Sequence, residues 1–165
     1  MNTMITLVGL TGPHQDAAAG MPVRPLEPGD VPELSSVQRH AYAGDPKQAP
    51  VGITGWRGSQ GVEGLGRTIE EASLVASGPD GQITAAIVIA ERDGEAVIAE
   101  LFTHPEHRRQ GLAEELLRHG MHVLHTLGHA TVTVTVEDNN SAAIALYLSR
   151  DFRRLTDEDP DSDYD

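Results

Sequence analysis

The stretch that decides the fold is Leu101-Phe102-Thr103-His104-Pro105-Glu106-His107-Arg108-Arg109-Gln110-Gly111-Leu112-Ala113. The apolar run over 96–103 predicts a strand that stops before Pro105, and an amphipathic helix is expected from about Gly111. Such a junction points the free N–H groups of the first helical turn at one spot. Gly111 lets a ligand approach the main chain closely, and Arg108 and Arg109 can pair with phosphate oxygens. The junction therefore predicts an anion site, suited to a phosphate or a pyrophosphate.

Periodicity on either side of this junction predicts alternating strands and helices. Helices are expected over about 31–43, 67–72, 111–127 and 139–148, and strands over 23–26, 73–77, 83–91, 96–103 and 131–136, with a last short strand from Phe152. Tight glycine-containing turns connect the middle strands as an antiparallel meander. The order predicts an α+β fold, with a mixed, mostly antiparallel sheet and helices on both faces.

The ends of the chain differ in composition from its middle. Residues 1–20 show no clear periodicity and are expected to form a flexible leader, followed by a domain over 21–156. Residues 157–165 contain six acidic residues and neither Lys nor Arg. We interpret this segment as a disordered acidic tail.

Composition excludes several classes of function. The net charge of −13 argues against a nucleic-acid partner, because a phosphate backbone would be repelled. No apolar run approaches the length of a membrane span, and the absence of cysteine excludes disulfides and thiol catalysis and suits a cytoplasmic protein. Four histidines on the helix over 111–127 and just beyond it lack carboxylate or thiol companions, so we interpret them as solvated and predict no metal site: His119, His122, His125 and His129.

A second motif lies one predicted strand beyond the first. It reads Asn140-Ser141-Ala142-Ala143-Ile144-Ala145-Leu146-Tyr147, followed by Phe152. The chain here resembles the GCN5-related N-acetyltransferase (GNAT) superfamily, whose signature joins an R/Q-x-x-G-x-G/A loop to N-x-x-A-x-x-L-Y-x-x-x-G-F. The matching residues, within a resemblance over roughly 22–155, are Arg108, Gly111, Ala113, Asn140, Ala143, Leu146, Tyr147 and Phe152.

Two residues depart from the pattern. Asp151 replaces the glycine before Phe152, so a non-glycine residue is expected there at positive φ, which Asp tolerates better than most residues. Thr135 stands where the ribosomal-protein alanine N-acetyltransferases carry a glutamate. This difference weakens the assignment of a protein N-terminus as the acceptor.

The resemblance implies acetyl-CoA as co-substrate and no metal. Its pyrophosphate would lie on the amides of Arg109 to Ala113, and its pantetheine along Leu101-Phe102-Thr103, where this strand and the strand over 131–136 splay apart. A free main-chain N–H on Leu101 or a neighbour could stabilise the oxyanion of the reaction. The implied coenzyme-binding residues are Leu101, Phe102, Thr103, Arg108, Arg109, Gln110, Gly111, Leu112, Ala113, Asn140, Ala143 and Tyr147.

The resemblance also implies two catalytic residues. Tyr147 matches the tyrosine that protonates the departing CoA thiolate in many relatives, although the ring could instead pack beneath the coenzyme without proton transfer. Glu100 lies where several relatives carry the base that deprotonates the amine, but it could also be a strand glutamate facing a polar cleft. His104 is an alternative base. Asn140 is expected to cap the last helix.

These inferences predict a cytoplasmic N-acetyltransferase that moves an acetyl group directly to a primary amine of a small molecule or peptide. The alternative is a non-catalytic acyl-CoA-binding or sensing module of the same fold. Neither nucleic acid nor a membrane is expected as partner, and a homodimer stays open. The acceptor pocket is expected from residues 31–66 and the loop near residue 92.

Overall fold

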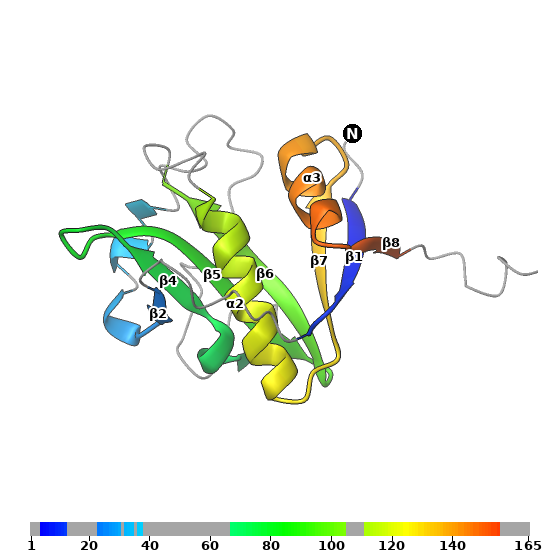
Figure 1. Ribbon diagram of the computed structural model, residues 1–165, viewed down its shortest axis with the longest axis horizontal. Coiled ribbons are helices and arrows are strands. Elements are labelled where there is room, and N and C mark those ends of the chain that lie inside the picture. Colours follow the sequence, from blue (N-terminus) through cyan, green and yellow to red (C-terminus); the bar gives the residue numbers. More distant parts are fainter. Residues whose placement is uncertain are drawn as a thin grey trace, which may run out of the picture.

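The computed structural model describes residues 4–12, 23–30, 32–34, 36–37, 67–104 and 111–155, and these contain one eight-stranded sheet (Figure 1). Its order is β2-β4-β5-β6-β7-β1-β8, with β3 paired to β5. Every strand pair is antiparallel except β6 and β7, so the predicted mixed, mostly antiparallel α+β fold is confirmed. The strands are β1 (Met4–Leu10), β2 (Val23–Pro25), β3 (Arg67–Thr68), β4 (Leu74–Ser77), β5 (Ile83–Arg92), β6 (Glu95–Thr103), β7 (Thr131–Glu137) and β8 (Arg153–Leu155).

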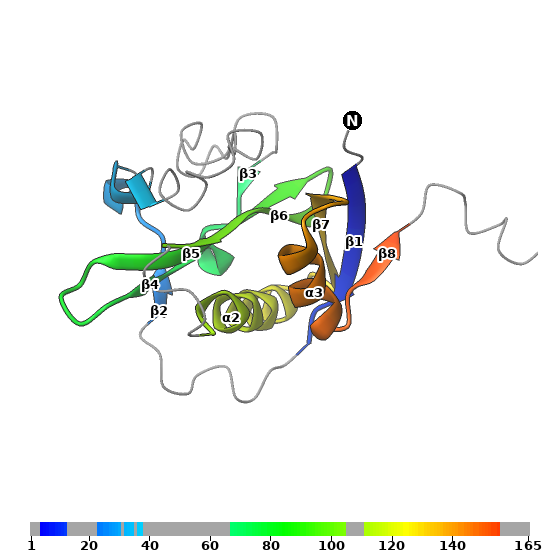
Figure 2. The same cartoon turned by 90° about the horizontal axis from the view of Figure 1, so that it is seen from above.

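Helical segments lie on both faces of the sheet, as the sequence predicts (Figure 2). On one face lie α2 (Leu112–Thr126), α3 (Ser141–Ser149) and the 3-10 turn η5 (Glu70–Ala72), and on the other lie the 3-10 turn η1 (Pro28–Asp30) and the helical residues 32–34 and 36–37. The rest of the helix predicted over 31–43 lies outside the described residues. The short helix predicted over 67–72 is partly wrong, because residues 67 and 68 pair with the end of β5 as β3.

Two hydrophobic cores follow from the alternation of side chains along β5. Ala85, Ile87 and Ile89 face α2 and belong to what we call the first core, together with residues of β1, β6, β7, α2 and α3. Ala86 and Val88 face the other way into the second core. Because both faces of β5 are covered, its residues from Ile83 to Ala90 are all buried and the strand reads as a nearly continuous apolar run.

The N-terminal strand β1 corrects the prediction of a flexible leader. It lies between β7 and β8, pairs with β7 over seven residue pairs from Met4↔Glu137 to Leu10↔Thr131, and buries Ile5 and Leu7 in the first core. The leader prediction is therefore wrong for residues 4–10, because the partners that hold this strand come from the far end of the chain. The other parts of the leader, at 1–3 and 13–20, and the acidic tail over 157–165 lie outside the described residues.

No helix in the described ranges is long and apolar enough to cross a bilayer.

Candidate functional site

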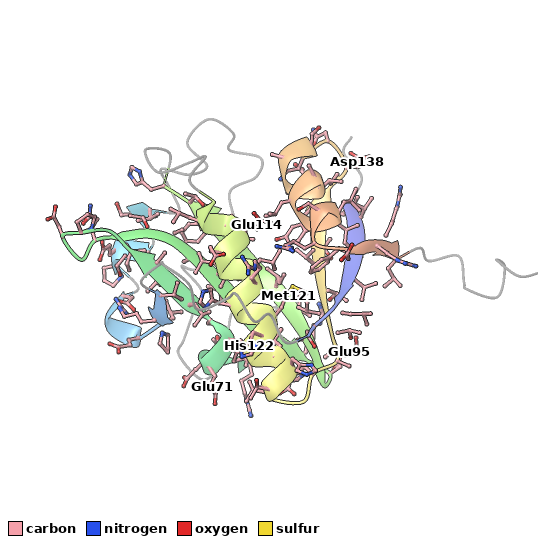
Figure 3. All side chains as sticks on the ribbon, viewed as in Figure 1. Glu71, Glu95, Glu114, Met121, His122 and Asp138 are labelled. Atoms are coloured by element: carbon pink, nitrogen blue, oxygen red, sulfur yellow. The ribbon has the colours of Figure 1, made fainter. Side chains whose placement is uncertain are left out.

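Strands β6 and β7 are paired at one end only. Their parallel register runs from Ala96↔Val132 to Ile98↔Val134 and stops there, although β6 continues to Thr103 and β7 to Glu137. Figure 1 shows the two strands diverging from this paired end. In Figure 3, Glu95 marks the paired end, and Asp138, just after β7, lies at the opposite end of that strand. The predicted splay is confirmed, and we call the part of β6 and β7 beyond Ile98 and Val134, where the two strands no longer pair with each other, the strand gap.

A β-bulge in β6 begins where the strand gap begins. Ile98 pairs with Ile89 of β5 and Glu100 pairs with the preceding Val88, so Ala99 is one extra residue. The bulge reverses the alternation of side chains, since Ile98 before it and Leu101 after it both contact the first core. Glu100 therefore lies on the same face as Phe102, which is buried in the second core.

The backbone of β6 turns donors toward the strand gap at two residues. The N–H of His104 donates to the carbonyl oxygen of Thr84 on β5 at 2.8 Å, so His104 and, by alternation, Phe102 direct their backbone groups toward β5. Leu101 and Thr103 direct theirs to the other side, where β7 has diverged. Of the three predicted contact residues on this strand, Leu101 and Thr103 thus face the gap with their main chain, and Phe102 packs in the core.

Helix α2 begins after the C-terminal end of β6, the end at which β6 has diverged from β7. Gly111 is its N-cap at φ +77°, and no heavy atom lies within 4 Å of a Cβ built there. Its carbonyl oxygen accepts the first helical bond, from the N–H of Glu115 at 3.0 Å. Because glycine offers no capping side chain, the N–H groups of Leu112 and Ala113 receive no cap from residue 111. The predicted loop residues Arg108, Arg109 and Gln110 lie outside the described residues.

Helix α3 begins as expected. The Oδ1 atom of Asn140 accepts a hydrogen bond from the N–H of Ala143 at 3.1 Å, so Asn140 is its N-cap.

The other end of α3 is closed by a Schellman motif. Asp151, at φ +71°, donates its N–H to the carbonyl of Leu148, and Phe152 donates its N–H to the carbonyl of Tyr147, both at 3.1 Å. The positive φ expected at Asp151 is confirmed. The motif turns the chain back so that Phe152 contacts Tyr147, with ring centroids 5.1 Å apart.

The two predicted catalytic side chains lie on opposite faces of the sheet. Tyr147 is 3% exposed and belongs to the first core, whereas Glu100 is 8% exposed and lies on the face of the second core. His104, the alternative base, is half-buried just after β6. The loop near residue 92 was expected to help form the acceptor pocket, but the turn at Asp93 and Gly94 precedes the paired end of β6, away from the strand gap. The other part of that expectation, residues 31–66, lies almost wholly outside the described residues.

Charged side chains connect the two helices and line α2. The Nη1 atom of Arg150, at the end of α3, lies 3.0 Å from Glu114 Oε2 in the first turn of α2. Within α2, His119 Nε2 lies 3.6 Å from Glu115 Oε2, and burial is the main cause that lowers the pKa of His119. We expected His119 to face solvent, but it is half-buried beside Glu115. The described residues contain no group of three His, Cys, Asp or Glu side chains that could hold a metal ion.

Comparison with known proteins assigns the family. The model of the acetyltransferase (GNAT) family matches residues 62–152, from just before β3 to Phe152. The chain belongs to the GNAT family. Strand β1 lies outside this match.

A bacterial acetyltransferase that acts on a ribosomal protein is similar to this chain both in sequence and in structure. The [ribosomal protein bS18]-alanine N-acetyltransferase of Escherichia coli K12 is 40% identical over 62 residues, which are 38% of this chain and 42% of that protein. The match thus spans less than half the length of this curated relative. The crystal structure of the E. coli ribosomal-protein-S18-alanine N-acetyltransferase superposes with a TM-score of 0.66 at 25% identity, over 83% of this chain and 80% of the other.

A GNAT family acetyltransferase from Brucella melitensis, solved in complex with acetyl-CoA, superposes with a TM-score of 0.60 at 19% identity, over 85% of this chain and 90% of the other. At this identity it supports the fold alone.

Proposed function

We propose that the protein is an acetyl-CoA-dependent N-acetyltransferase that moves an acetyl group directly to a primary amine of a small molecule or peptide. The observation that carries this proposal is the strand gap. The pairing of β6 and β7 stops at Ile98 and Val134, and Leu101 and Thr103 turn backbone donors into the space beyond. Membership of the GNAT family supports the same conclusion.

The described residues fit acetyl-CoA, which supplies an activated acetyl thioester when bound. The amides of Leu112 and Ala113 at the start of α2 suit the pyrophosphate, and Gly111 leaves the space that a closely approaching anion needs. Leu101 and Thr103 suit the pantetheine amides and the thioester oxygen, because their N–H groups face the gap. Ala143 and Asn140 are proposed to contact the coenzyme from α3.

We propose that Tyr147 and Glu100 supply the acid and the base for a direct transfer. The amine nitrogen forms a bond to the acetyl carbon, the carbon–sulfur bond breaks, and its electron pair leaves with sulfur. Tyr147 is proposed to give its phenol proton to that sulfur, and Glu100 to accept the proton that the amine loses. Solvent then returns a proton to Tyr147 and removes one from Glu100. The two side chains lie on opposite faces of the sheet, so the proposal has acid and base act from opposite sides of the strand gap.

A thiol-release assay tests the activity. Because the chain contains no cysteine, a thiol-specific dye reports only CoA and has no protein background. We expect the wild type to release CoA in the presence of at least one amine from a panel of a polyamine, an amino sugar and a peptide with N-terminal alanine. Tyr147→Phe and Glu100→Gln should each lower kcat about 100-fold or more, the usual range for general acid–base residues. Unchanged rates in both variants would refute the assigned roles.

Thermal unfolding, together with the thiol assay, distinguishes an enzyme from a protein that binds acetyl-CoA without catalysis. A ligand that binds only the native state stabilises it by about 2.7 kcal/mol at a concentration one hundred times its Kd. An enzyme should show this stabilisation with acetyl-CoA and also release thiol. A protein that is stabilised by acetyl-CoA but releases no thiol with any amine would be the acyl-CoA-binding module instead.

Two observations bear on the acceptor and compartment. The similarity to a ribosomal-protein alanine acetyltransferase supports including the alanine peptide in the panel. The resemblance in sequence implies a glutamate where this chain has Thr135, and this difference favours a different amine. The hydroxyl of Thr135 lies 3.2 Å from that of Thr6 on β1.

The absence of cysteine supports a cytoplasmic site of action.

A further inference from the structure

Gly9 on β1 lies against the ring of Phe152. A Cβ built onto Gly9 would lie 2.6 Å from one ring carbon of Phe152 and 2.7 Å from two others, closer than non-bonded carbons can approach. Gly9 stands opposite Val132 of β7, so its pairing with β7 holds its backbone in place. The absence of a side chain at residue 9 is therefore what makes room for the Phe152 ring.

The ring of Phe152 is buried and contacts Tyr147. Phe152 is 2% exposed and Tyr147, which it contacts, is 3% exposed. Its backbone is tied to Tyr147 as well, through the hydrogen bond from the Phe152 N–H to the Tyr147 carbonyl. Since a packed interior transmits displacement, a side chain added at residue 9 must shift the ring, the Schellman motif or Tyr147 itself.

We propose that Gly9 is a positioning residue for Tyr147, acting through Phe152. The N-terminal strand thereby becomes part of the acyl-transfer machinery, although it lies outside the stretch that matches the family. This inference rests on the proposed function, in which Tyr147 donates a proton to the departing sulfur.

The first test is Gly9→Ala, with Gly12→Ala as the matched control. No heavy atom lies within 4 Å of a Cβ built at Gly12, so the control adds the same methyl group without a clash. We expect Gly9→Ala to lower kcat about 10- to 100-fold, the usual cost of misplacing a catalytic group by up to about 1 Å. The KM for acetyl-CoA should stay within about twofold, because most of the proposed coenzyme contacts are amides of β6 and the start of α2. A kcat equal to that of the control would overturn the proposal.

The second test asks whether Gly9 acts through the phenol. In a Tyr147→Phe background the proton donor is already lost, so Gly9→Ala should lower kcat by less than about twofold further. A full additional loss in that background would mean that Gly9 supports the fold in general, and would refute the positioning role.

A third measurement does not depend on acetyl transfer. The chain has three tyrosines, so labelling with 3-fluorotyrosine gives few fluorine NMR signals, and the loss of one in Tyr147→Phe assigns it. That signal should shift in Gly9→Ala and stay in place in Gly12→Ala. If the wild type transfers no acetyl group but the signal shifts, the packing inference stands and the proposed function fails. If the wild type is active and the signal does not shift, the inference fails alone.

A double variant covers the case in which Gly9→Ala does not fold. Phe152→Leu removes the ring carbons that would clash, so Gly9→Ala/Phe152→Leu should fold and melt at a higher temperature than Gly9→Ala. Its kcat should remain low because the ring that contacts Tyr147 is gone. Wild-type kcat in this double variant would overturn the proposal.

Discussion

Substitutions at Asp151 should change the free energy of unfolding in a predictable order. Asp151 occupies the glycine position of the Schellman motif at φ +71° and is exposed to solvent, so substitutions there change backbone strain and charge but little packing. Left-handed backbone costs a residue with a Cβ about 1–2 kcal/mol, and Asp pays the lower end of this range. A carboxylate at a helix C-terminus costs about 0.3–1 kcal/mol more. The wild-type residue is therefore suboptimal on both grounds.

Three variants separate these contributions. Asp151→Asn removes the charge and keeps the shape, so we expect a gain of about 0.3–0.5 kcal/mol that shrinks at high salt. Asp151→Gly removes charge and strain, but glycine adds about 0.5–1 kcal/mol of unfolded-state entropy, which leaves a net gain of about 0.5–1 kcal/mol. Asp151→Val should lose about 1–2 kcal/mol because a β-branched residue does not tolerate this conformation.

Thermal and urea unfolding measure the series directly. For a chain of this length, 1 kcal/mol corresponds to about 2–4 °C in Tm, so the order Gly, Asn, Asp, Val should span several degrees. Asp80→Asn, in an exposed turn away from any helix end, is the control for loss of a carboxylate and should change Tm little. A Val variant as stable as the wild type would show that Asp151 does not hold the left-handed conformation.

Two further predictions concern Ser73, between η5 and β4, and the half-buried His119 on α2. Ser73 is fully buried, and its hydroxyl accepts from the Ile89 N–H at 3.0 Å and donates to the Ile69 carbonyl, so Ser73→Ala should cost about 1–3 kcal/mol in urea unfolding. Ser149→Ala, which removes an exposed hydroxyl, should stay within about 0.5 kcal/mol, and equal losses would contradict the argument. Burial lowers the pKa of His119, so the unfolded state binds more protons and stability should fall as the pH drops below about 6.5. His119→Gln should flatten that pH dependence while the exposed His122→Gln does not, and identical pH profiles for the two variants would refute it.

Local sequence patterns predict most of the fold. The meander β4-β5-β6, the helices α2 and α3, and β7 between them all lie within a few residues of where periodicity and turn residues predict them. These elements are recognisable because the spacing of apolar residues within each one indicates which of its faces is buried. Asn140 and Asp151 were interpretable for the same reason, since a helix cap depends on residues that are neighbours in the chain.

Strand β1 shows where local pattern fails. Its alternation is short and half apolar, and the partners that bury Ile5 and Leu7 come from β7, β8 and α3 at the opposite end of the sequence. A β-strand has no internal hydrogen bonds, so it forms only against a partner strand, and the local sequence does not indicate which strand that is. The leader prediction failed for this reason.

The sequence by itself determined the family signature, the order of the elements and the residue types at the candidate site. Only the tertiary structure decided which face of the sheet each catalytic candidate lies on, because the bulge at Ala99 reverses the alternation that the sequence alone would assign to Glu100. It also decided that Gly9 lies against the ring of Phe152 beside Tyr147, since contact between segments more than a hundred residues apart cannot be seen in the local pattern of either segment.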